Sequence, residues 1–221
     1  MLIKSLELPT RIDIEEFISR EAHDLRSPFN QVIGFGKMLI NTVKNEPFSD
    51  LQKEDLHTVY RSGMRALVLM NALIDATRLN RGEKTVSRAE TAIESMLSHS
   101  AAQWRKFHPG VDFEVQYHIH ASSPSLLTDE MHAQQTITGI LGYVALFCES
   151  KASIDMTVED DEQHFIFTFT CKGTKARAVS AMDLELMGYV CRAQVELLGG
   201  SIRRAEENDD GALIQFGLPK K

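Results

Sequence analysis

The sequence is poor in cysteine and has no long hydrophobic segment. Its three cysteines, Cys148, Cys171 and Cys191, are widely spaced and form no CxxC pair, so we expect reduced thiols in a cytoplasmic protein. The longest apolar run, ITGILGYVALFC at 137–148, is well short of the roughly 20 residues that a membrane span requires. The acidic N-terminus lacks the apolar core of a signal peptide. We therefore predict a chain that does not enter the membrane.

Acidic side chains outnumber basic ones, and the 221 residues carry a formal net charge of −7. Residues 1–84 hold 12 basic and 12 acidic side chains, whereas residues 85–221 hold 12 and 19. An acidic balance argues against nucleic acid and anionic membranes as main partners. The acidic second region would also not attract a nucleoside triphosphate by its general field.

The first region contains two heptad-spaced rows of apolar residues. The row over 18–43 predicts one long helix at about residues 12–44, and the row over 56–77 predicts a second helix. Between them, NEPFSD at 45–50 supplies a proline turn and a capping Ser or Asp, and Gly82 is the expected C-cap of the second helix. Two long helices joined by a short loop form a helical hairpin.

A single hairpin leaves a broad apolar stripe exposed. We therefore predict a homodimer in which two hairpins form a four-helix bundle, with burial of the stripe by the second region as the alternative. The second region alternates between helical and strand-like segments. The expected helices are 88–107, 128–150 and 181–200, and the expected strands are 111–119, 152–160, 164–172, 201–208 and 212–219. The predicted architecture is a helical hairpin over 1–84 followed by an α+β sandwich domain over 85–221.

The first helix carries an unusual polar group in the stretch REAHDLRSPF. His23 is predicted on the solvated flank of the bundle, where a neutral imidazole is a good nucleophile. Asp24 can orient the ring and accept a proton from it, and Ser27 lies one turn further on the same face. Pro28 has no N–H, so the helix is expected to bend just past the histidine and present it to a partner.

This stretch, FISREAHDLRSPF followed by IGF, resembles the phosphoacceptor box of two-component histidine kinases. The likeness rests on a Phe six residues before the His, an acidic residue after it, then Leu-Arg, Ser-Pro and a later Gly-Phe. The resemblance implies that His23 is phosphorylated, that Asp24 is the acid/base, and that Ser27 assists dephosphorylation of the partner. Arg26 and Asn30 would help to dock that partner.

The order of elements after residue 84 is similar to the ATP-binding domain of the same family, but the nucleotide motifs differ. Tyr143 stands where the family has the Mg²⁺-binding Asn, and Leu146 where it has a nearby Lys. Cys171 replaces the Asp that bonds adenine, although Gly173 is kept. ELMG at 185–188 stands in place of the glycine-rich loop before the last helix, and the connection leaves little room for a lid. We therefore expect no ATP or Mg²⁺ cofactor.

His118 and His120 share one side of a predicted strand, but no further ligands accompany them, so no metal site is expected. The resemblance to kinase-derived dimeric phosphotransferases implies that His23 exchanges a phosphoryl group with an Asp of a response regulator receiver domain, with a receiver or separate kinase upstream. Three alternatives stay open: a true histidine kinase with a diverged nucleotide site, a non-catalytic pseudokinase adaptor, and a phosphatase that uses Asp24 and Ser27.

Overall fold

The computed structural model describes most of the second region and the second helix of the first. The described residues are 4–5, 27–28, 31–32, 34–35, 49–107, 113–148, 151–173, 180–208 and 211–220. Most of the predicted first helix, 12–44, therefore lies outside the described residues.

Helix α2 (Asp50–Asn80) is the second helix of the predicted hairpin and forms because both of its ends are capped. At its start, Ser49 Oγ accepts from the backbone N–H of Gln52, and the Gln52 side chain accepts from the backbone N–H of Ser49. This reciprocal capping box satisfies N–H groups that have no partner within the helix. At its end, Gly82 adopts φ of +65°, the left-handed conformation that glycine permits at little cost. The predicted N-cap is confirmed, whereas the C-cap is Arg81 and Gly82 follows it.

The second region is built on a six-stranded mixed sheet in the order β1-β7-β8-β6-β5-β3. Strands β3 and β5 are parallel and the remaining neighbours are antiparallel. The strands are β1 (Lys4–Ser5), β3 (Glu114–Ile119), β5 (Ser153–Asp160), β6 (His164–Lys172), β7 (Ser201–Asn208) and β8 (Gly211–Pro219). In β5 and β6, buried residues alternate with half-buried ones, as expected for a sheet covered on one face. The five strands predicted after residue 110 are confirmed.

Besides β1, two short segments form strands that the sequence did not predict. The stretch 89–92, expected to be helical, is strand β2 (Ala89–Ala92), which pairs antiparallel with β4 (Ser125–Thr128). Helix α3 (Ile93–Phe107) starts only after it, where the N–H of Ile93 donates to the carbonyl of Pro124 at 2.9 Å. Pairing with a distant segment thus overrides the helix propensity of alanine and glutamate. The helix predicted over 128–150 is shorter than expected, because residues 125–128 form β4 and the helix spans only Glu130–Ala145.

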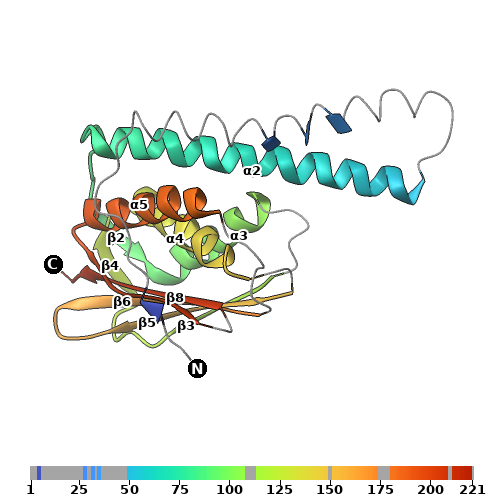
Figure 1. The fold of residues 1–221 in the computed structure, drawn as a ribbon. Helices are drawn as coiled ribbons and strands as arrows, with labels where there is room; N and C mark the ends of the chain where they lie inside the picture. Colours follow the sequence, from blue (N-terminus) through green and yellow to red (C-terminus); the bar gives the residue numbers. More distant parts are fainter. Residues whose placement is uncertain are drawn as a thin grey trace.

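Three helices cover one face of the sheet: α3, α4 (Glu130–Ala145) and α5 (Ala181–Leu197) (Figure 1). The core lies between these helices and the sheet. It includes Trp104 from α3, and Phe167, Phe169 and Phe216 from adjacent strands β6 and β8. The Phe167 and Phe216 rings stack with their centroids 4.9 Å apart. The predicted α+β architecture is confirmed for this region.

Helix α2 lies across the outer side of α5, away from the sheet (Figure 1). A small apolar cluster joins them, formed by Leu69 and Ala76 of α2 and Leu186, Tyr189 and Val190 of α5. The second region therefore buries part of the apolar surface of α2, which is the alternative that the sequence left open. Other apolar side chains of α2 stay open to solvent.

Candidate functional site

The predicted phosphoacceptor residue and most of its neighbours lie outside the described residues. The predicted residues concerned are His23, Asp24, Arg26 and Asn30, and their roles stay predictions. Ser27 is described: it is helical and exposed, and Pro28 beside it is helical and half-buried.

The described part of the phosphoacceptor stretch lies alongside α2. Ser62 Oγ of α2 donates to Gln31 Oε1 at 2.9 Å. Val32 Cγ2 lies 3.7 Å from the point that a Cβ would occupy at Gly63. The short helical pieces follow α2 in Figure 1. These contacts place the two segments side by side, as the predicted hairpin requires.

The described residues of this stretch divide into two sets by exposure. One set is half-buried and consists of Pro28, Val32 and Phe35. The other set is exposed and consists of Ser27, Gln31 and Gly34. Each set is spaced by four and then three residues, which is the repeat of one helix face. Ser27 therefore lies on the more exposed side of this stretch, whereas Val32 packs toward α2 and Gln31 reaches Ser62 from the exposed side.

Tyr143, which the sequence predicts in place of the family's Mg²⁺-binding Asn, fills the core at the end of α4 together with Phe147. Tyr143 is 3% exposed and Phe147 is 2% exposed. Their rings meet edge to face with centroids 5.6 Å apart. Burial, and then the proximity of Cys191 and Glu207, raises the pKa of the Tyr143 phenol far above its usual range. A neutral, buried phenol is a poor ligand for Mg²⁺, which prefers carboxylate, amide and water oxygens.

Cys171, which the sequence predicts in place of the family's adenine-binding Asp, is buried. The thiols of Cys171 and Cys148 form a hydrogen bond, which lowers the pKa of Cys148. The same hydrogen bond and, after it, burial raise the pKa of Cys171. A Cβ at Gly173 would lie 2.7 Å from the Cβ of Ala152, so glycine is needed there for packing alone. Its retention is thus explained without a nucleotide.

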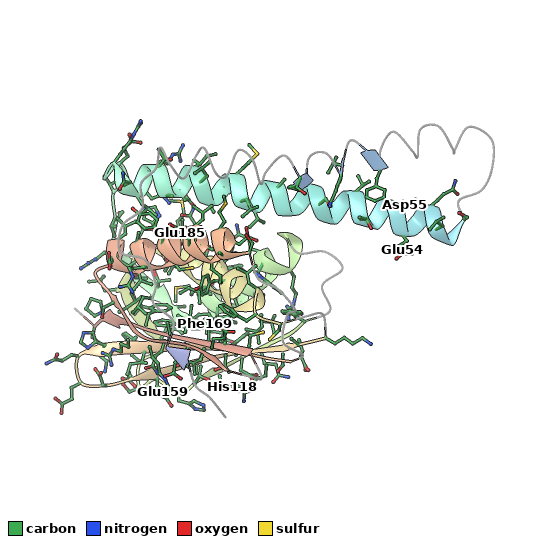
Figure 2. The ribbon with its side chains drawn as sticks, in the orientation of Figure 1. Glu54, Asp55, His118, Glu159, Phe169 and Glu185 are labelled. Atoms are coloured by element: carbon green, nitrogen blue, oxygen red, sulfur yellow. The ribbon has the colours of Figure 1, made fainter. Side chains whose placement is uncertain are left out.

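The segment ELMG lies inside α5, so the prediction that it stands before the last helix is wrong. Figure 2 shows Glu185 on this helix. The helix starts after Ser180, whose Oγ accepts from the backbone N–H of Asp183 at 3.4 Å. This start agrees with the helix that the sequence predicts from residue 181, so only the placement of ELMG before the helix is corrected. Residues 174–179, where a nucleotide lid was considered, lie outside the described residues.

His118 and His120 stack with ring centroids 6.4 Å apart at the sheet edge formed by β3. Among the described residues, no group of three or more His, Cys, Asp or Glu side chains is placed to hold a metal ion.

Asp129 fixes the segment that joins α2 to the second region, a role that the sequence reasoning missed. Its Oδ1 accepts from the backbone N–H of His132 at 3.0 Å, which caps α4, and its Oδ2 accepts from the backbone N–H of Ser87 at 2.8 Å. His132 Nε2 lies 3.1 Å from the carbonyl oxygen of Thr85. Burial opposes ionisation, but these N–H groups outweigh it and lower the pKa of Asp129. An Asp before a helix was the available signal.

We expect Asp129→Ala to destabilise the fold by about 2 kcal/mol at neutral pH, because it removes a helix cap and a charged hydrogen bond. Since folding lowers the pKa of Asp129, its contribution is complete above its unfolded pKa of about 4 and is lost as pH falls through the folded pKa. Urea unfolding at several pH values measures this. Asp129→Asn should cost less, because its one amide oxygen can still cap α4 while its NH₂ group cannot accept from Ser87. An equal loss for Asp129→Ala at pH near 2 would contradict the assignment.

Residues 13–82 match the family model of the His Kinase A (phospho-acceptor) domain. The chain is 28% identical over 145 residues to signal transduction histidine-protein kinase BarA of Escherichia coli (strain K12), covering 65% of this chain and 15% of BarA. Histidine kinase AdeS of Acinetobacter baumannii has a similar structure, with a TM-score of 0.63 and 14% identity over 90% of this chain and 98% of that chain. Histidine kinase ThkA, solved in complex with response regulator protein TrrA, gives a TM-score of 0.63 and 15% identity over 93% of this chain and 61% of that chain.

A helical segment that matches a phosphoacceptor domain is followed by an α/β region whose fold is similar to that of solved histidine kinases. Residues 13–82 match the phosphoacceptor domain family, and the chain as a whole is similar to two-component histidine kinases. It spans between 15% and 38% of the length of the curated relatives it matches, so the likeness concerns only this part of those proteins. Within the described residues, no helix is both long enough and apolar enough to cross a lipid bilayer.

Proposed function

We propose that this chain is a histidine phosphotransfer protein in which His23 exchanges a phosphoryl group with an aspartate of a response regulator receiver domain. When His23 accepts, a P–N bond forms at the imidazole as the P–O bond of an aspartyl phosphate breaks, and the carboxylate of the donor leaves. Asp24 takes the proton that the ring gives up. The match of residues 13–82, which include His23, to a phosphoacceptor domain carries this proposal.

The open face of the first helix supports docking of a receiver. Ser27 is exposed, and His23 precedes it by four residues, so a continuous helix places both on one face. Arg26 and Asn30 lie beside them in the sequence and are the proposed docking residues. The structurally similar ThkA has been solved with a response regulator bound, which fits a partner of this class.

The proposal includes phosphotransfer without ATP, because the positions of the family's nucleotide-binding side chains carry core residues. Tyr143 and Cys171 are both buried, and neither offers the carboxylate or amide oxygen that Mg²⁺ and adenine require. A phosphoryl group that arrives from a receiver or from a separate kinase is already activated. The second domain would then brace the helices or help to dock the partner.

Two phosphoryl donors, offered separately to the intact chain, test this proposal. One is Mg²⁺-ATP, and the other is a receiver domain charged with radiolabelled acetyl phosphate. Acid-labile label from the receiver but not from ATP is the expected result. Label from ATP alone would identify a true histidine kinase with a diverged nucleotide site. Label from neither donor would favour a non-catalytic adaptor.

We also propose that two copies pair through their hairpins into a four-helix bundle. Met70 and Ile74 of α2 are 40% and 47% exposed, which leaves apolar surface that a second hairpin would bury. These residues are four apart and so lie on one face of the helix.

Met70→Glu is expected to weaken the homodimer by more than about tenfold, because two carboxylates would be buried at a symmetric interface. Sedimentation velocity over a range of protein concentrations measures the change. Leu51→Glu is the control, since Leu51 lies at the first turn of α2 and is 69% exposed. A Met70→Glu protein that dimerises as tightly as wild type would contradict this interface.

A further inference from the structure

Two of the three cysteines, all of which are buried thiols, lie together in the second region. Cys171 is near the end of β6, on the side of the strand where the buried residues face the helical layer. Cys148 follows the end of α4, one of the helices that cover this face. The thiols of Cys148 and Cys171 form a hydrogen bond, so their sulfur atoms are direct neighbours. The third cysteine, Cys191, lies on α5.

A glycine on the neighbouring strand lets Cys148 approach β6. Gly211 lies on β8, diagonally opposite Cys171 of β6. A Cβ at Gly211 would lie 3.0 Å from Cys148 Sγ and 2.9 Å from the carbonyl carbon of Cys171. Gly211 also has φ of +146°, which residues with a side chain seldom adopt. A side chain at this position would displace Cys148, so the glycine seats the Cys148 sulfur over the backbone of Cys171.

The two thiols differ in exposure and in acidity. Cys148 is 7% exposed, whereas Cys171 is 1% exposed. The hydrogen bond between them lowers the pKa of Cys148, while the same bond and burial raise the pKa of Cys171 far above its usual range. A thiolate is the form of cysteine that reacts with peroxides, and a second thiol in contact can then close a disulfide. Cys148 therefore suits the first of these reactions and Cys171 the second.

We propose that Cys148 and Cys171 are a peroxide-sensitive pair that forms an intramolecular disulfide. The Cys148 thiolate attacks one oxygen of hydrogen peroxide, the O–O bond breaks, and hydroxide leaves, so that sulfur is oxidised to a sulfenic acid. The sulfur of Cys171 then attacks the sulfur of Cys148, the S–O bond breaks, and the hydroxyl group leaves with the Cys171 proton as water. Peroxide supplies the oxidising equivalents and ends as hydroxide and water.

The disulfide would join the end of α4 to the central sheet of the second region. A transient disulfide is compatible with thiols that are reduced at rest, because cytosolic disulfides are mostly redox-sensing or catalytic. The pair does not depend on the proposed phosphotransfer, since neither cysteine belongs to the phosphoacceptor stretch.

Thiol counting in the intact chain tests the pair. The folded protein is treated with hydrogen peroxide, the peroxide is removed with catalase, and the thiols are counted after unfolding. We expect the count to fall from three to one and to return to three with dithiothreitol, and peptide mass spectrometry to find Cys148 linked to Cys171. Oxidation of methionine does not change this count. A count that stays at three would overturn the proposal, because the two thiols would then only fill the core.

Three variants assign the roles of the cysteines. Cys191→Ser is the matched control, since Cys191 is also 1% exposed but lies on α5, and it should leave the link intact. In Cys171→Ser no second thiol closes the disulfide, so dimedone should trap the sulfenic acid at Cys148. Cys148→Ser should give neither product. If a variant fails to fold, the wild-type measurement still decides, because it involves no substitution.

Two further results would overturn the proposal. One is a disulfide that includes Cys191. The other is an equal yield of the Cys148–Cys171 link from folded and from urea-unfolded protein, because the fold would then have no part in bringing the two thiols together.

Discussion

His23→Ala is expected to abolish phosphoryl transfer from a charged receiver domain, lowering the rate by more than about a thousandfold. Alanine offers no nitrogen nucleophile, and an exposed serine such as Ser27 is a weak substitute at neutral pH. Rapid-quench measurement of acid-labile label on the chain gives the rate. His57→Ala is the matched control, because His57 lies on α2 outside the predicted phosphoacceptor stretch and should leave the rate unchanged.

Two outcomes would contradict the role of His23. Undiminished label in His23→Ala would mean that another residue is the acceptor. If His23→Ala still discharges the phosphorylated receiver at the wild-type rate while Ser27→Ala does not, the protein is a phosphatase that relies on Asp24 and Ser27.

Phe216→Ala is expected to destabilise the second region by about 4 kcal/mol, through lost burial and the cavity left behind. The Phe216 ring stacks on Phe167 with centroids 4.9 Å apart and lies 5.9 Å from Phe169. All three are fully buried between sheet and helices. A loss of this size is a large part of the stability of an ordinary domain. Trp104, the single tryptophan and also buried in this core, reports unfolding by its fluorescence in urea.

The neighbouring residue on the same strand provides the control. Gln215 points to the other face of the sheet, where its Nε2 donates to Thr168 Oγ1 at 3.0 Å. Gln215→Ala should cost about 1 kcal/mol or less. Similar costs for Phe216→Ala and Gln215→Ala would contradict the packing. A second experiment compares labelling of His23 in wild type and in Phe216→Ala at a urea concentration that unfolds only the variant. Loss of label in the variant alone would show that transfer needs the second domain.

Local patterns determined most of the secondary structure. Alternation of apolar and polar residues predicted strands such as β5 and β6, because successive side chains point to opposite faces of a sheet. In the structure these residues are alternately buried and half-buried. Helix α2 was bounded by Ser49 and Gly82, residues whose capping role depends only on their own turn. The match of residues 13–82 to the phosphoacceptor domain family was also predictable from the stretch around His23, because its motif is contiguous in the sequence.

The tertiary structure alone decided which distant segments meet. Lys4 and Ser5 pair with Glu207 and Glu206 and extend the sheet of the second region, although they precede the hairpin in the chain. Residues 89–92 become a strand because Ser125–Thr128 lies beside them.

The linker contact of Asp129 and the close approach of α5 to α4 also arose only from folding. A backbone pairing or a packing contact depends on both partners at once, so neither segment carries a periodic signal of its own. Gln194 shows this most directly. In the sequence it is one polar residue in an apolar helix, and in the fold its buried amide oxygen lies 3.5 Å from the point that a Cβ would occupy at Gly139, 55 positions earlier in the chain.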